Sequence, residues 1–175
     1  MSASAIVLAM HGSPPLDFPR EQLGELFGLH MRLSDPSLAG EARARMEGRH
    51  AELESRIRNW PRTPQNDPFL VASMELAGHL SEAAGSRVFV GFNEFCSPSM
   101  DAALDEAAAS GVTRIVVVTP MMTRGGEHSE RDIPDAVERA RGRHKAVEFV
   151  YAWPFDPADV GRFLAGCIAG RLRRD

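Results

Sequence analysis

Residues 113–119 read TRIVVVT, and this stretch decides the fold class of the chain. Its centre is a run of β-branched apolar residues from Ile115 to Val118, with Gly111 before it and Pro120 after it. A short apolar run that does not alternate with polar residues is typical of a strand buried on both faces of a parallel sheet. The stretch therefore predicts a central strand of an α/β protein.

Strand and helix patterns alternate on both sides of this strand. Short apolar runs predict further strands over residues 5–10, 87–95 and 147–151. Helical spacing and helix-starting residues predict helices over 19–33, 37–60, 69–84 and 97–110, and two more that begin near Asp132 and Asp156. Ser97 and Pro98 are expected to cap and start the helix over 97–110. The alternation predicts a doubly wound parallel sheet with helices on both faces, joined by right-handed crossovers.

The composition narrows the class of protein. Of the 175 residues, 43% are apolar and 25% charged, which is typical of a globular domain and predicts one domain over 1–175. The formal net charge is −4 and no strongly basic stretch is present, so nucleic acid is not an expected partner. Only Cys96 and Cys167 occur, outside any CxxC pair, which argues against a zinc ribbon or a disulfide scaffold.

The same features predict a cytoplasmic protein. The first ten residues, MSASAIVLAM, lack the basic start of a signal peptide and are interpreted as a first strand that ends at His11. No run reaches the roughly 18 apolar residues that a membrane helix needs, so no membrane partner is expected. The low cysteine content fits a reducing compartment.

His11, Glu94 and His128 follow three of the predicted strands. In open parallel sheets, ligands bind beyond the carboxyl ends of the strands, which is where these side chains are expected to lie. Two imidazoles and a carboxylate suit a divalent transition ion and leave coordination positions open. The same groups can accept protons near neutral pH. Taken singly, each histidine also fits a hydrogen-bonded loop residue, and Glu94 fits a surface carboxylate.

A glycine pair precedes the helix that begins near Asp132. Gly125 and Gly126 permit close backbone approach, and a helix N-terminus favours anions, so Arg124 and Arg131 could assist in binding carboxylates there. An ordinary turn between a strand and a helix explains the glycines equally well.

The neighbouring Met121 and Met122 could line an apolar cleft for a flat macrocycle, or pack in the core. Cys96, two residues from Glu94, could be a soft metal ligand but is interpreted as a small buried residue. Roles outside a site are expected for four histidines: His30 and His79 within helices, and His50 and His144 on solvated surfaces.

Three stretches together resemble a known family. They are AMHGS at 9–13, FNEF at 92–95 followed by Pro98 and Ser99, and the segment 118–134, which contains GEH and DIP. In this order they resemble the CbiX-type class II chelatases, which include the sirohydrochlorin cobaltochelatases and ferrochelatases of cobalamin and siroheme synthesis.

The resemblance implies a chelatase-like doubly wound sheet in a single lobe. It also implies that His11 and His128 bind the metal and act in catalysis, and that Glu94 assists both. No organic cofactor is implied; the metal is a substrate, Co²⁺ or Fe²⁺, with Ni²⁺ as a further candidate. Against the family pattern, residues 19–68 form an inserted helical stretch, Met122 and Thr123 replace the usual pocket residues, and Phe155-Asp156 replaces a Leu-Gly pair.

We therefore expect an enzyme that inserts the ion into sirohydrochlorin or a related carboxylate-rich tetrapyrrole. The residues expected to contact this ring are Ser13, Met121, Met122, Arg124, Gly125, Gly126 and Arg131. One lobe presents half the cleft of a two-lobed chelatase, which predicts a homodimer; the inserted helices could instead cover the cleft of a monomer. The alternative function is a carrier that binds metal or tetrapyrrole without turnover. A nucleotide-binding protein is disfavoured because neither GxGxxG nor GxxxxGK[ST] occurs.

Overall fold

The computed structural model describes residues 4–173 and has an α/β architecture built on one parallel sheet. The strands lie in the order β2-β1-β3-β4, and every pair is parallel. Their bounds are β1 Ser4–Met10, β2 Val88–Phe92, β3 Arg114–Val118 and β4 Glu148–Tyr151. The predicted doubly wound parallel sheet is confirmed, with the TRIVVVT segment as an inner strand.

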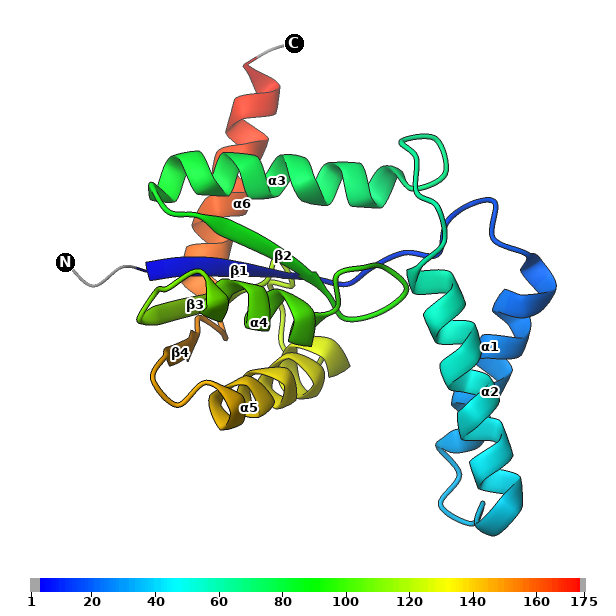
Figure 1. Cartoon of the computed structure of the whole chain (residues 1–175). Helices are drawn as coiled ribbons and strands as arrows, with labels where there is room; N and C mark the ends of the chain where they lie inside the picture. Colours follow the sequence, from blue (N-terminus) through cyan, green and yellow to red (C-terminus); the bar gives the residue numbers. More distant parts are fainter. Residues whose placement is uncertain (1–3, 174–175) are drawn as a thin grey trace.

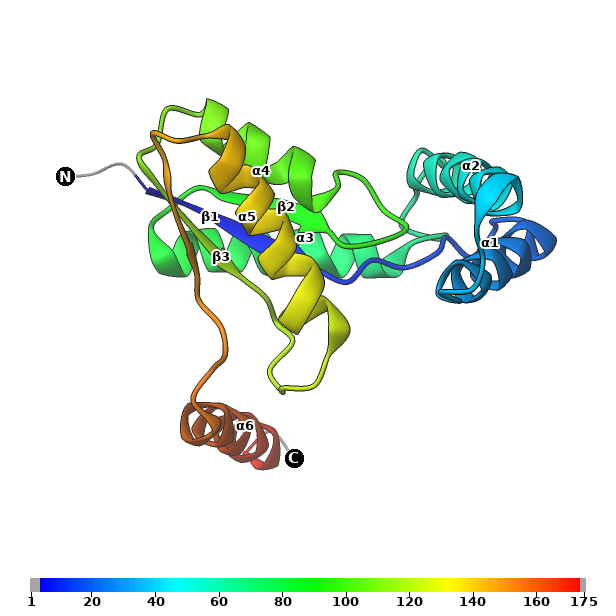
Figure 2. The ribbon, with the colours of Figure 1, turned by 90° about the horizontal axis from the view of Figure 1, so that it is seen from below.

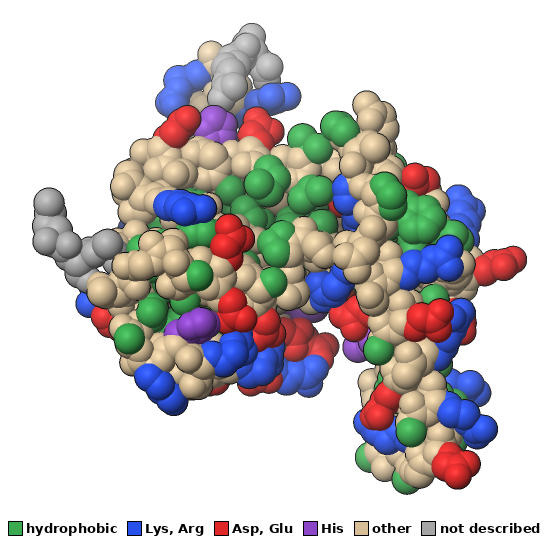
Figure 3. Space-filling view, in the orientation of Figure 1, with side chains coloured by type: hydrophobic (Ala, Val, Ile, Leu, Met, Phe, Trp, Pro, Cys, Tyr) green, Lys and Arg blue, Asp and Glu red, His purple; other side chains and the backbone are tan. Residues whose placement is uncertain are grey.

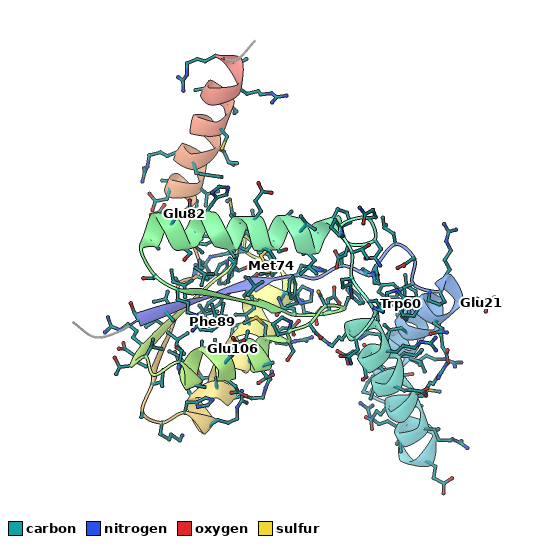
Figure 4. The ribbon with its side chains drawn as sticks, turned by 45° about the horizontal axis from the view of Figure 1, so that its top comes forward. Glu21, Trp60, Met74, Glu82, Phe89 and Glu106 are labelled. Carbon is teal, nitrogen blue, oxygen red and sulfur yellow. The ribbon has the colours of Figure 1, made fainter. Side chains whose placement is uncertain are left out.

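Helices cover both faces of the sheet. α3 (Pro68–Ala84) packs on one face, while α4 (Met100–Ala109) and α5 (Ile133–Arg143) pack on the other (Figures 1 and 2). Alternate strand residues point to opposite faces, so Val7 and Val117 join the core under α4 and α5, whereas Leu8 and Phe92 join the core under α3. Figure 4 shows Phe89 on β2 and Glu106 on α4, on the side away from α3. No helix of residues 4–173 is long and apolar enough to cross a bilayer.

The segment after β2 differs from the prediction. β2 ends at Phe92, not at Phe95, and α4 begins at Met100 with Ser99 as its cap, where Ser97 was expected. The Ser99 hydroxyl accepts a hydrogen bond from the Ala102 N–H at 3.3 Å. A tertiary contact explains this difference. The Phe92 N–H donates a hydrogen bond of 2.9 Å to the carbonyl of Pro98, which keeps residues 93–98 as a loop along the sheet edge.

The stretch predicted as inserted helices forms a hairpin that projects from the sheet. Its helices are α1 (Arg20–Leu33) and α2 (Gly40–Arg58) (Figure 1). Its distal surface carries acidic and basic side chains of mixed sign (Figure 3), while Trp60 lies at its base (Figure 4). The hairpin is joined to the sheet by a small apolar cluster of Phe18, Leu26, Leu53, Ile57 and Phe95.

Two arginines also fasten the base of the hairpin to the loop after β2. Arg58 donates hydrogen bonds to the carbonyls of Asn93 at 2.7 Å and Cys96 at 2.8 Å. Arg62 forms an ion pair with Asp67 at 2.5 Å, and the side chain of Asp67 is only 1% exposed. A buried carboxylate needs such a partner, because removing one member of a buried pair costs about 3–5 kcal/mol. Arg62 also donates a hydrogen bond of 2.5 Å to the carbonyl of Phe95, so both arginines hold the loop between β2 and α4.

The backbone of β1 continues beside that of β2 beyond the ends of both strands. The N–H groups of Asn93 and Glu94 donate to the carbonyls of Met10 and His11 at 2.9 and 3.0 Å. This approach leaves no room for a side chain at Gly12, where an added Cβ would lie 1.9 Å from the Glu94 carbonyl oxygen. Gly12 also has a φ of +104°, a conformation that other residues rarely adopt.

The Gly12→Ala substitution is expected to lower the free energy of unfolding by more than about 1 kcal/mol, because both the backbone conformation and the contact with Glu94 resist a Cβ. Urea unfolding followed by circular dichroism measures this. Gly28→Ala is the matched control: Gly28 lies in α1 with open space around it, so alanine should stabilise the protein by about 0.5–1 kcal/mol. Equal effects of the two substitutions would contradict the account.

Candidate metal centre

The structure brings His11, Glu94 and His128 together at the carboxyl ends of the strands. Nδ1 of His11 lies 3.1 Å from Oε1 of Glu94, and Nε2 of His128 lies 3.6 Å from the same oxygen. The two imidazole rings meet edge to face with centroids 4.4 Å apart. One ligand atom from each residue lies within 4.8 Å of the others, which is compact enough for one metal ion. The predicted juxtaposition of the three side chains is present.

Each of the three side chains is placed by a different element. His11 leaves β1 directly, and Glu94 lies in the loop that the arginines of the hairpin hold. His128 opens a π-helical turn, His128–Asp132, which runs into α5. Such turns are frequently found at functional sites. The turn is anchored by Ser129, which is fully buried and whose carbonyl accepts a hydrogen bond from Tyr151 at 3.0 Å.

Asp132 is a further candidate site residue, which the sequence pattern indicated only as the start of a helix. Its Oδ2 lies 2.6 Å from Nδ1 of His128. A carboxylate on one ring nitrogen orients a histidine and makes the other nitrogen a better ligand. Nε2 of His128 is the atom that faces Glu94. The signal in the sequence was the four-residue spacing from His128 to Asp132, which places both on one helix face.

A cavity of about 390 Å³ contains Glu94 and His128. One wall comes from the π-helical turn and the loop after β2, and the opposite wall comes from the α1–α2 hairpin. The residues that line it are Leu26, Phe27, His30, His50, Glu54, Asn93, Glu94, Phe95, Glu127, His128, Arg131 and Asp132. The four carboxylates among them face one arginine, so the charges of the lining favour a cation.

Some residues expected to contact a ring lie at this cavity and others do not. Arg131 lines it and pairs with Glu127. Arg124 is exposed, and the Gly125 N–H bonds to Glu130 at 2.9 Å in the turn before His128. The carbonyl of Gly126 accepts hydrogen bonds from the Ser129 hydroxyl and the Glu130 N–H. Ser13 presents its carbonyl to Arg62 at 2.9 Å.

The two methionines lie elsewhere. Met121 packs against the core, and its carbonyl accepts a hydrogen bond from the Trp153 indole at 3.0 Å. Met122 is 36% exposed and shares a separate cavity of about 160 Å³ with Val160 and Phe163 of the last helix. Adjacent residues after a strand point in different directions, which a sequence pattern of two apolar residues does not reveal.

The structure confirms the interpretation of Cys96 but differs for two of the remaining histidines. Cys96 is a small buried residue as predicted, and burial raises the pKa of its thiol. His30 and His50 were expected to lie outside the site, but both line its cavity on the hairpin side. His144 lies 2.7 Å from Asp105.

Part of the sequence matches a known family and two curated proteins. The CbiX family model matches residues 71–162, more than half of the chain. A sirohydrochlorin cobaltochelatase of Methanopyrus kandleri is 51% identical over 47 residues, 27% of this chain and 32% of that protein. Another sirohydrochlorin cobaltochelatase, of Sulfurisphaera tokodaii, is 42% identical over 52 residues, 30% of this chain and 42% of that protein.

These matches span well under half the length of both curated relatives. Among solved structures, a putative cobalamin (vitamin B12) biosynthesis CbiX protein of Marinobacter aquaeolei VT8 shares the fold with a TM-score of 0.55 at 18% identity, over 98% of this chain and 99% of that chain. The family match contains Glu94, His128 and Asp132. By that match, the chain belongs to the CbiX family.

Proposed function

We propose that this protein is a chelatase that inserts Co²⁺ or Fe²⁺ into sirohydrochlorin or a related tetrapyrrole. The observation that carries the proposal is the cluster of His11, Glu94 and His128, whose ligand atoms lie within 4.8 Å of one another beside an open cavity. The curated relatives named sirohydrochlorin cobaltochelatase support the same reaction.

The cluster has the properties that a substrate metal requires. Two imidazoles and one carboxylate suit first-row divalent ions without supplying a full coordination shell. The side chains of His11 and Glu94 are 50% and 31% exposed, so an ion can exchange between this cluster and a ring in the cavity. A closed site with four protein ligands would instead retain its ion.

The reaction releases two protons from ring nitrogens for each divalent ion inserted. A ligand that gives up the ion regains a lone pair and can accept one of these protons. We assign the acceptor role first to Nε2 of His128, because Asp132 on the other nitrogen stabilises the resulting imidazolium. His11, next to Glu94, is the second acceptor. Two protons then replace one divalent ion, and the charge of the site is restored.

We propose that Arg124 and Arg131 bind the carboxylates of the tetrapyrrole, because the guanidinium group forms paired hydrogen bonds with a carboxylate. Arg131 lines the cavity and would exchange its Glu127 partner for the substrate. Two further segments lie next to the proposed metal ligands in the sequence. The turn at Gly125 and Gly126 precedes His128, and Ser13 follows His11.

The His11→Ala and His128→Ala variants are expected to reduce metal insertion to the uncatalysed rate, because each removes a metal ligand and a proton acceptor. The measurement is anaerobic incubation with sirohydrochlorin and Co²⁺ or Fe²⁺, followed by absorbance. His79→Ala is the control, since His79 is 72% exposed on α3, and should match the wild type. Tight binding of ring or metal by the wild type without any acceleration would favour the carrier function instead.

The Asp132→Asn variant is expected to weaken Co²⁺ affinity by about 10–100-fold, the usual cost of losing an outer partner of a ligating histidine. Titration with Co²⁺, with no tetrapyrrole present, measures this. Asp135→Asn, an exposed position on α5, serves as the control and should leave the affinity unchanged. The role given to Asp132 would be wrong if both variants bound Co²⁺ like the wild type.

We further propose that the protein is a homodimer through its last helix. α6 (Pro157–Leu172) extends away from the sheet (Figures 1 and 2), and none of its residues is buried. Phe163 and Ile168 are 55% and 62% exposed. Val150 on β4 is also 39% exposed, on the sheet face that α3 covers only in part. A second copy can bury both surfaces by placing its α6 against this part of the sheet.

The Ile168→Glu variant is expected to be monomeric where the wild type is dimeric, because a carboxylate cannot enter an apolar interface without a partner. Sedimentation velocity at micromolar concentration distinguishes the two states. Leu16→Glu is the control, since Leu16 is 77% exposed on a loop far in sequence from α6, and should remain dimeric. A wild type that sediments only as a monomer would exclude the dimer.

A further inference from the structure

A second group of metal-ligating side chains lies on the hairpin, across the cavity from His128. His30 comes from α1, and His50 and Glu54 come from α2. The ring centroids of the two histidines are 5.9 Å apart, and Nδ1 of His50 lies 3.9 Å from Oε2 of Glu54. All three line the cavity that holds Glu94 and His128. The proposed activity assigns them no role.

The separations of His50 from His30 and from Glu54 are close to those of ligands that share one divalent ion. Metal–ligand bonds of about 2.0–2.1 Å place two ligand atoms of a tetrahedral ion roughly 3.4 Å apart, close to the distance between His50 and Glu54. An imidazole centroid lies roughly 1 Å behind its ligating nitrogen, so two rings on one such ion have centroids about 5–6 Å apart. The His30–His50 separation falls in this range. Completing the site requires side-chain rotation, because these three side chains are not yet gathered as closely as His11, Glu94 and His128.

The hairpin holds the three side chains in a fixed register. Arg49, next to His50, donates two hydrogen bonds of 2.8 Å to the carboxylate of Glu25 on α1. This pairing lowers the pKa of the Glu25 carboxyl. Oε1 of Glu54 accepts hydrogen bonds from Arg58 at 3.0 and 3.2 Å, which leaves Oε2 directed towards His50. The two helices and the carboxylate are therefore positioned before any ion arrives.

We infer that His30, His50 and Glu54 form a second divalent-metal site, which captures the ion and loads the cluster of His11, Glu94 and His128. The shared cavity supports this route, because an ion bound at the exposed His30 and at His50 reaches His128 without leaving the cavity. Two imidazoles and one carboxylate on each side give both sites the same preference for first-row transition ions. The loading role rests on the proposed chelatase activity, whereas metal binding at the hairpin does not.

Titration with Co²⁺ in the absence of tetrapyrrole tests the site directly. The wild type should bind two ions per chain, and His30→Ala and His50→Ala should each bind one, with loss of part of the visible Co²⁺ absorption. His79→Ala is a closely matched control, since His79 also lies on a helix beside a glutamate, Glu82, at 3.8 Å. It should still bind two ions. Far-ultraviolet circular dichroism checks that each variant is folded.

The outcomes separate this site from the proposed activity. A wild type that binds one ion, or hairpin variants that still bind two, would overturn the second site even if insertion is catalysed. A fall from two ions to one in the hairpin variants would support the site even if no insertion is observed. In that case the proposed function, and the loading role with it, would be wrong.

Insertion kinetics test the loading role. With Co²⁺ as the varied substrate, His50→Ala should raise the Co²⁺ concentration for half-maximal rate several-fold and lower the maximum rate much less. His11→Ala should lose insertion at every Co²⁺ concentration. A His50→Ala variant with the same Co²⁺ dependence as the wild type would show that the hairpin site does not load the cluster.

Discussion

The close approach of the β1 and β2 backbones beyond the ends of their strands is the constraint on which the site depends. The Glu94 N–H bonds to the His11 carbonyl, and Gly12 contacts the Glu94 carbonyl with no space for a side chain. The segments after β1 and β2 are fixed to each other at the backbone. The imidazole of His11 and the carboxylate of Glu94 therefore meet without long, mobile loops. His128 then needs only the π-helical turn at the start of α5 to reach the same point.

The α1–α2 hairpin helps to fix the loop that carries Glu94, and it also contributes side chains to the cavity. Arg58 and Arg62 hold the carbonyls around Glu94, so the loop that carries the carboxylate is fixed from the hairpin side as well. The same helices present His30, His50 and Glu54 to the cavity. The hairpin thus completes a wall that a bare sheet would lack. The cluster of His11, Glu94 and His128 lies within one chain, and the proposed dimer rests on the apolar surface of α6.

The sequence predicted those parts of the fold that local pattern controls. Buried strands without alternation and parallel order together imply that residues after β1, β2 and β3 share one edge, which is why His11, Glu94 and His128 could be grouped in advance. The cap of α4 was predicted at Ser97 and lies at Ser99, because the backbone hydrogen bond between Phe92 and Pro98, which local pattern does not reveal, decides it.

Contacts made by the hairpin were not predictable for a similar reason. Arg58 binds backbone carbonyls, which every residue has, so no side-chain pattern in the loop after β2 marks its partner. The placement of His30 and His50 follows from that docking. Met122 could be expected either at a ring pocket or in the core from its apolar character, and the structure places it in a separate cavity beside α6.

The most direct test of the account is a crystal structure of the protein soaked with Co²⁺, with anomalous diffraction recorded at the cobalt edge. The account predicts an anomalous peak within bonding distance of His11, Glu94 and His128, with Asp132 still on the other nitrogen of His128. Cobalt bound elsewhere, with no peak between these three side chains, would contradict the central claim that they form the site from which the metal is inserted.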